Sequence, residues 1–207
     1  MSDLYALLRH SLAGLRLLVA MTVVTGLAYP LLVTGVAQVA FPWQARGSLL
    51  TAEGTRTTSV SEAVGSSLIG QVNDDPRLFH PRPSAAGEGY DTLATYGSNL
   101  GPESPDLIAA VRERRAEVAA REDVDPATVP PDALTASGSG LDPDISPAYA
   151  ALQVPRVARE NGLSEDVVRA LVADATRDRT LGFLGEPRVN VLELNLSVTA
   201  ARADDAP

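Results

Sequence analysis

Hydrophobic positions are concentrated near the start of the chain. No Asp, Glu, Arg or His interrupts the run from Leu17 to Ala40, and a helix of that length spans roughly 36 Å, enough to cross a bilayer with some tilt. Phe41 and Trp43 follow directly, where amphipathic rings favour the membrane interface. The pattern predicts a transmembrane helix over residues 17–40, after a short N-terminus of residues 1–16.

Charges beside this run are nearly balanced between its two ends. Arg9 and Arg16 precede the run and Arg46 and Arg56 follow it, but the amino terminus adds positive charge to the first side. We therefore expect a single-pass protein of the cell membrane with a cytoplasmic N-terminus and an extracytoplasmic C-terminal domain. A cleavable signal peptide is the alternative, although its apolar region normally has about 7–15 residues.

Two residues inside the run predict an irregular helix, either one that packs against a partner or a lone kinked anchor. Gly26 permits another helix to approach closely. Pro30 removes an intrahelical hydrogen-bond donor, so we expect a kink near Tyr29.

Beyond residue 41, helical and alternating stretches are mixed. This mixture predicts an α+β fold, with one soluble domain over residues 41–200 and a frayed tail over residues 201–207. Helices are expected where a serine precedes an amphipathic stretch, and these begin at Ser104, Ser146 and Ser164. The second contains Pro155, which predicts a kink or a restart that displays Gln153, Arg156 and Arg159 on either side.

Strands are expected in three stretches. Residues 47–64 are a linker or a small strand pair, and residues 66–72 have the composition of a strand. Residues 186–198 alternate but change phase near Val191 and Leu192, which indicates a strand with either a bulge or two-sided burial there. Between them, residues 74–105 are so rich in Gly, Pro, Asn and Asp that we predict a long loop, typical of an interaction surface.

The composition excludes several kinds of chemistry. The hydrophobic content of 45% is that of a protein with a core, the formal net charge is −9, and all 17 basic residues are Arg. Without Lys there is no Walker-type phosphate loop, no Schiff-base lysine and no Asp-Lys-Thr phosphorylation signature. Without Cys there is no thiol nucleophile and no thiolate zinc site, and with only His10 and His80 a multi-histidine metal site is excluded. An acidic chain without basic clusters also argues against nucleic acid.

The junction "TASGSGLDPDISP", residues 135–147, has three interpretations. Gly138 and Gly140 permit backbone amides to approach a phosphate, although no lysine is present and Asp142 and Asp144 repel polyphosphate. The two aspartates are also hard oxygen ligands for a cation, but their spacing does not match a calcium loop. The structural interpretation is a turn followed by a helix that Ser146 caps.

His80 lies in the stretch "FHPRPSAAG". As a catalytic base it needs a nearby Asp and an exposed Ser, and the chain has no Gly-x-Ser-x-Gly elbow. A loop histidine is the preferred interpretation. A membrane-anchored extracytoplasmic Ser/His hydrolase and a free-standing binding module remain the alternative functions.

Several motifs occur together in register over most of the chain. Taken with the anchor, they resemble the C subunit of the bacterial Kdp potassium-transporting P-type ATPase. The motifs are "TGLAYPLLVTG" (25–35), "FHPRPSA" (79–85), "YGSNLGP" (96–102), "SGSGLDPDISP" (137–147), "QVPRVA" (153–158) and "GFLGEPRVNVLELNL" (182–196).

The resemblance implies a non-catalytic subunit of a complex that imports K⁺ at the expense of ATP. Its partners would be a channel-like K⁺-binding subunit, a catalytic P-type ATPase subunit, a small membrane peptide subunit and the lipid bilayer. The subunit would have no cofactor of its own.

The resemblance also implies a role as catalytic chaperone that raises the ATP affinity of the catalytic subunit. The contacts it implies with shared ATP are Ser137, Gly138, Ser139, Gly140 and Gln153. A domain outside the cytoplasm has no access to cytoplasmic ATP. We therefore favour a role in stabilising the assembly or gating ion entry.

Overall fold

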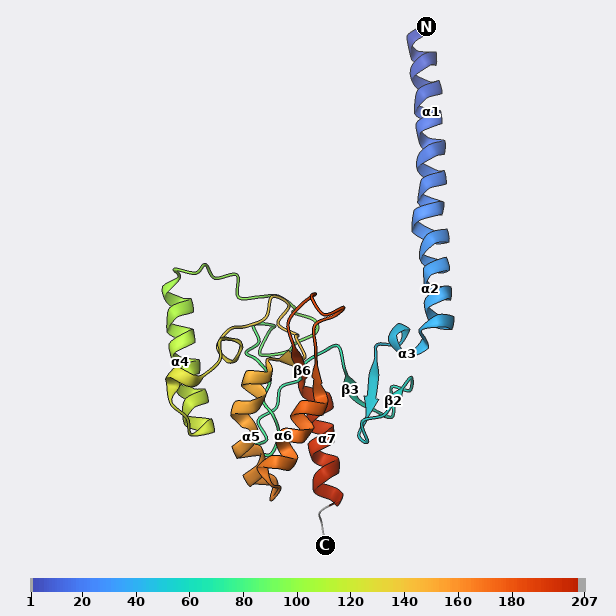
Figure 1. The fold of residues 1–207 in the computed structure, drawn as a ribbon. Helices are drawn as coiled ribbons and strands as arrows, with labels where there is room; N and C mark the ends of the chain where they lie inside the picture. Colours follow the sequence, from blue (N-terminus) through green and yellow to red (C-terminus); the bar gives the residue numbers. More distant parts are fainter. Residues whose placement is uncertain (1, 205–207) are drawn as a thin grey trace. The chain divides into compact units, whose positions relative to one another are not determined.

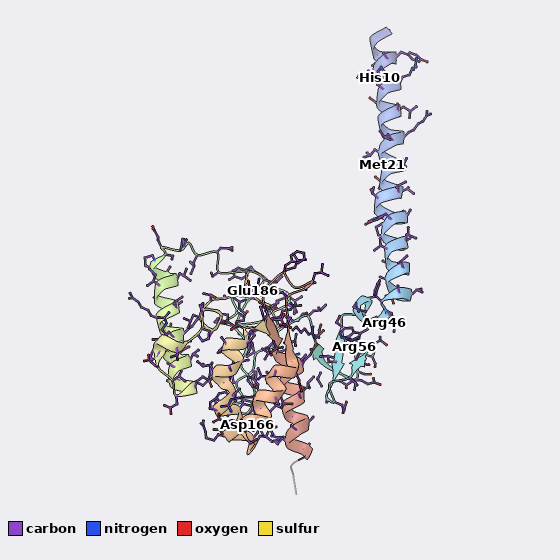
Figure 2. The ribbon with its side chains drawn as sticks, viewed as in Figure 1. His10, Met21, Arg46, Arg56, Asp166 and Glu186 are labelled. Carbon is purple, nitrogen blue, oxygen red and sulfur yellow. The ribbon has the colours of Figure 1, made fainter. Side chains whose placement is uncertain are left out.

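The computed structural model describes residues 2–204 and divides into two compact units, Met1–Ser48 and Leu49–Pro207. The first unit contains α1 (Ser2–Val23), a π-helical turn (Val24–Ala28), α2 (Tyr29–Ala40) and the short α3 (Pro42–Ala45) (Figure 1). The helix therefore begins well before residue 17, and its stretch Leu4–Ala40 is long and apolar enough to cross a membrane. His10 and Met21 mark this helix in Figure 2.

The π-helical turn lies where proline disturbs the helix. Pro30 has no N–H, and its ring clashes with the carbonyl of the residue four positions earlier. The turn before it widens, and the Tyr29 N–H donates to the carbonyl of Val24, five residues back. The irregularity predicted near Tyr29 takes this form.

The second unit is a mixed helix and sheet domain, which confirms the predicted α+β class. One antiparallel sheet has the order β2–β1–β3, from β1 (Leu49–Thr51), β2 (Arg56–Thr57) and β3 (Ala63–Ser66). The other has the order β4–β6–β5, from β4 (Asp144–Ile145), β5 (Thr176–Arg177) and β6 (Arg188–Asn190). The first sheet bears out the small strand pair expected within residues 47–64.

Four helices complete this unit: α4 (Pro105–Glu122), α5 (Pro147–Asn161), α6 (Glu165–Ala175) and α7 (Val191–Asp204). In Figure 1 they run as columns, and α6 packs against both α5 and α7. The helices bury one continuous apolar core that includes Phe79, Tyr149, Val168, Leu194 and Val198. Short 3₁₀ turns at Pro126–Thr128 and Pro131–Ala133 connect α4 towards β4.

Three helix starts agree with the sequence. The hydroxyls of Ser146 and Ser164 accept the N–H of Tyr149 and Val167, and so cap α5 and α6. At α4, Ser104 occupies the cap position and Pro105 the first turn. Helix α5 ends at Asn161, and the following Gly162 adopts a left-handed conformation with φ of 72°.

Pro155 does not interrupt α5, which contradicts the predicted restart. Ala151, whose carbonyl loses its partner, and Pro155 itself are both exposed, so water can satisfy that carbonyl. The prediction that Gln153 and Arg156 are displayed is also wrong, because they are 0% and 3% exposed. Arg159 is exposed as expected.

The strand predicted over residues 66–72 is wrong. Strand β3 ends at Ser66, which pairs with Leu49 at the start of β1, so the ladder has no partner strand beyond it. The Ser66 hydroxyl accepts the N–H of Leu68 and turns the chain. The irregular segment then extends to α4, as predicted for residues 74–105.

The strand predicted over residues 186–198 is confirmed only for Arg188–Asn190 and is wrong beyond them, where a helix replaces it. Strand β6 ends at Asn190, whose side-chain oxygen accepts the N–H of Glu193 and starts α7. The change of phase near Val191 is a change from strand period to helix period, because Val191, Leu194 and Val198 are all buried. Helix α7 continues to Asp204, into the tail expected to fray, and residues 205–207 lie outside the described part of the chain.

Candidate functional site

Two loops in the second unit contain the motif "FHPRPSA" and the first half of "SGSGLDPDISP", and we call residues 76–90 and 135–142 the locked loops. They are held by side chains from helices far away in the sequence. Asn195 of α7 accepts the N–H of Phe79 at 2.7 Å and donates to its carbonyl at 3.0 Å. Gln153 of α5 likewise accepts the N–H of His80 at 2.7 Å and donates to the His80 carbonyl at 3.2 Å. Each side-chain amide therefore satisfies both backbone hydrogen-bonding groups of one loop residue, as a paired strand would.

A buried ion pair supports this arrangement from α4 and α5. The side chain of Glu122 is fully buried and accepts from Arg156 at 2.9 Å and from Arg121 at 2.8 Å. Arg156 also donates to Gln153 at 2.9 Å, to the carbonyl of Leu78 at 3.0 Å and to that of Pro76. Because these donors and acceptors satisfy one another, the cost of burying the two charges is offset. The bonds from Arg156 to the backbone also fix the start of the first loop.

Burial determines the protonation of His80. The pKa of its imidazole is lowered to about 4, first by burial and then by the nearby cations Arg121 and Arg156. Its contact with the backbone of Asn73 opposes this change only in part. A base with a pKa of about 4 is poorly matched to proton abstraction at neutral pH, so the arrangement does not favour a hydrolase that uses His80.

The two locked loops are joined to each other around Ser84. Its hydroxyl donates to the carbonyl of Gly140 at 2.6 Å and accepts the N–H groups of Ala86 and Tyr90. Arg82 and Asp142 form an ion pair at 2.8 Å across the same junction. Residues of "RPSA" and "SGSGLDP" therefore form one interlocked surface.

Gly140 is required by this junction. Its φ is +69°, and a Cβ there would lie 2.7 Å from the Cβ of Ala86 and 2.9 Å from the carbonyl oxygen of Tyr96. Gly138, two residues earlier, has nothing within 4 Å of such a Cβ. The two glycines of one motif thus have different physical roles.

The five residues predicted to contact nucleotide do not form one surface. Ser137, Gly138 and Ser139 line a groove of about 600 Å³ together with Arg82, and Gly138 and Ser139 are exposed. Gly140 is buried against the first loop. Gln153 is fully buried and bonded to the backbone of His80. Nucleotide contact stays a prediction. Of the five residues, only Gly138 and Ser139 are exposed to a ligand, because Ser137 is also buried.

Sequence reasoning missed several buried polar residues that hold irregular segments of the second unit. Glu122, Asn190 and Asn195 are buried polar groups, and Asn190 also donates to the carbonyl of Ser67 at 2.8 Å. The two asparagines interrupt the apolar run "VNVLELNL", which was the available signal. Inside an otherwise apolar stretch, a polar residue of this kind is generally buried with a partner.

Asp144, which the sequence offered as a cation ligand, lies in β4 and pairs with Asn190 of β6. Its carboxylate accepts from Arg188 at 3.0 Å and from Asn190 at 3.3 Å. Burial and the neighbouring Asp142 raise the pKa of the Asp144 carboxyl. Within residues 2–204, no group of three or more His, Asp or Glu side chains is arranged to hold a metal ion.

Comparison with known proteins identifies relatives along almost the whole chain. The family model described as "KdpC: K+-transporting ATPase, c chain" matches residues 11–200. A potassium-transporting ATPase KdpC subunit from Kineococcus radiotolerans is 55% identical over 195 residues, which cover 94% of this chain and 95% of the relative. Subunits of the same name from Beijerinckia indica and Sorangium cellulosum are 49% and 52% identical, over 94% and 95% of this chain and 95% and 100% of theirs.

Proposed function

Because the chain belongs to the KdpC family of K⁺-transporting ATPase c chains, we propose that it is the non-catalytic subunit that stabilises such a complex from the extracytoplasmic side. Its partners would be the channel-like K⁺-binding subunit, the catalytic P-type subunit and a small membrane peptide subunit. The relatives' printed name supports the K⁺-transporting ATPase, and the apolar helix supports attachment to the membrane.

The observation that carries this proposal is how the polar groups of the motifs are used. Gln153 and Asn195 fix the backbone of one locked loop, and Ser84 joins that loop to the other. A protein whose motif residues mainly set the shape of its surface is suited to binding a partner rather than to turning over a substrate. The domain therefore acts by the surface that these loops form, held near the membrane by its helix.

Co-purification of the full chain with the other subunits tests the proposal. We expect the tagged chain to retain the channel-like and catalytic subunits in detergent, and cells that lack the chain to grow poorly at low K⁺. Re-expression of the wild-type chain is the control for growth. Failure to co-purify, or unchanged growth at low K⁺ without the chain, would overturn it.

The side of the membrane is tested by protease access to the domain in sealed vesicles. The proposal expects cleavage from the outside in intact cells stripped of their outer layers, and protection in inverted vesicles. Cleavage only in inverted vesicles would place the domain in the cytoplasm.

A role in raising the ATP affinity of the catalytic subunit is the second candidate. The groove lined by Arg82, Gly138 and Ser139 is the feature that favours it, since backbone amides suit phosphate. The guanidinium of Arg82 is already paired there with Asp142, so the amides would supply most of the attraction. Gly138→Glu in the assembled complex would fill the groove with a negative charge and should weaken ATP binding severalfold, measured by titration of ATPase activity. An unchanged ATP dependence would dismiss this role.

A further inference from the structure

The turn between β5 and β6 carries a cluster of exposed apolar side chains. Leu181 is 79% exposed, Phe183 68% and Leu184 49%, and all three lie in the tip Thr180–Gly185. The tip contains no ionisable side chain, although the whole chain has a formal net charge of −9. Isolated exposed apolar residues are normal on a protein surface, but three within four positions form a patch.

The tip is held in one conformation by its own backbone. Thr180 and Leu184 exchange two hydrogen bonds of 2.9 Å, and the N–H of Gly182 donates to the carbonyl of Arg179 at 2.9 Å. Leu181 adopts φ of +55°, a left-handed conformation that is unfavourable for a leucine. The hydrogen bonds fix this turn although Leu181 has an unfavourable backbone conformation, and the leucine side chain stays exposed. Such a turn is suited to binding, because it has little conformational entropy left to lose.

Every arginine at the base of the tip already has an acidic partner. Arg179 pairs with Glu186 at 2.5 Å, and Arg177 pairs with Glu193. Arg188 pairs with Asp144 at 3.0 Å. Glu186, labelled in Figure 2, marks this base. Each positive charge at the base of the tip is therefore balanced by a carboxylate.

We propose that the tip Thr180–Gly185 is a docking element that inserts Leu181 and Phe183 into an uncharged apolar socket on another subunit of the K⁺-transporting complex. This inference rests on the proposed function. Charge complementarity selects the occupant: an uncharged tip on an acidic domain fits a neutral apolar socket. An anionic lipid surface would instead call for unpaired basic residues beside the apolar ones.

The small size of the patch also favours a partner that belongs to the same assembly. Three side chains bury far less area than an independent protein interface needs. A second contact becomes effective when another attachment already holds the two molecules together, because the local concentration is then high. The membrane helix provides such an attachment to a partner within the complex.

Paired substitutions in the full chain test the docking element. In Leu181→Asn and Phe183→Asn the apolar group is lost, and asparagine tolerates the left-handed conformation at position 181. We expect each variant to bind the remaining detergent-solubilised subunits at least tenfold more weakly than the wild type, measured by fluorescence titration. Val60→Asn is the matched control, since Val60 is 82% exposed and lies in the β2–β3 turn. It should bind as the wild type does.

A photoreactive phenylalanine analogue at position 183 identifies the occupant in native membranes. The proposal expects a cross-linked product with the mass of this chain plus another subunit of the complex. Cross-links only to lipid, only to a second copy of the chain, or to nothing would overturn it, as would wild-type affinity of both tip variants. If the wild-type chain itself does not associate, the proposed function fails; if it associates but the tip does not contribute, only this inference fails.

Discussion

Phe79 and Phe183 lie in segments without regular secondary structure, yet Phe79 is fully buried and Phe183 is 68% exposed. The locked loop around Phe79 takes its conformation from Asn195, Gln153 and Arg156, whose side chains come from α7 and α5. The tip around Phe183 takes its conformation from hydrogen bonds between its own backbone groups. One segment is ordered by the rest of the domain and the other orders itself.

The two segments should therefore respond differently to substitution. Substitutions that affect the locked loops should change the stability of the whole domain, since distant elements meet there. Substitutions at the tip should leave the domain folded, because it depends on few other residues.

Removing the buried carboxylate should have the largest effect. In Glu122→Ala, Arg156 is left charged and buried, and we expect the free energy of unfolding to fall by about 3–5 kcal/mol. Urea denaturation of the detergent-solubilised full chain, followed by circular dichroism, measures the change. Glu160→Ala is the control, because the Arg159–Glu160 pair is exposed and its loss should cost at most about 1 kcal/mol. Equal effects of the two variants would contradict the importance of the buried pair.

The second prediction concerns pH and His80. Because the folded protein lowers the pKa of this imidazole from 6.5 to about 4, the unfolded chain binds a proton more readily. The contribution to stability is therefore complete above about pH 6.5 and is lost as the pH falls towards 4, by about 3 kcal/mol in all. His80→Asn should remove this part of the pH dependence between pH 4 and 6.5. A variant with the same pH profile as the wild type would contradict it.

The third prediction uses two glycines of one motif. In Gly140→Ala the new Cβ lies too close to Ala86 and Tyr96, and φ is positive, so we expect a loss of about 2–3 kcal/mol. Gly138→Ala has open space around its Cβ and a φ outside the left-handed region, so it should be neutral or slightly stabilising. Thermal unfolding of the two variants side by side measures the difference. Similar melting temperatures would mean that the junction around Ser84 does not constrain Gly140.

Features that depend on local sequence were predictable. The apolar helix was visible as an uninterrupted run, and Ser146 and Ser164 were recognised as caps because a cap needs only the next three residues. The helix begins at Ser2, before the predicted membrane span of residues 17–40, since charged residues do not prevent helix formation.

Features that depend on distant contacts were not predictable. Gln153 bonds to a residue 73 positions away and Asn195 to one 116 positions away, so nothing beside them indicates burial. Helix α7 was predicted as a strand because "VLELNLSV" alternates as well as a strand does. The helix is selected by the Asn190 cap and by burial of Leu194 and Val198 in the core. Of the candidate site, the motif loops were found but the side chains that hold them were missed.

The smallest predicted effect distinguishes the tip most clearly from the locked loops. Leu181→Gly removes the unfavourable left-handed leucine and should raise the free energy of unfolding by about 0.5–1 kcal/mol, because glycine adopts this conformation without strain. Leu184→Gly is the matched control, since Leu184 is not in the left-handed conformation. Glycine there only raises the conformational entropy of the unfolded chain, which should lower the free energy of unfolding by about 0.5–1 kcal/mol. Urea denaturation of both variants gives the sign directly. A loss of stability in Leu181→Gly would mean that the leucine is held by packing within the domain, and the tip would then be a part of the core rather than a surface displayed for a partner.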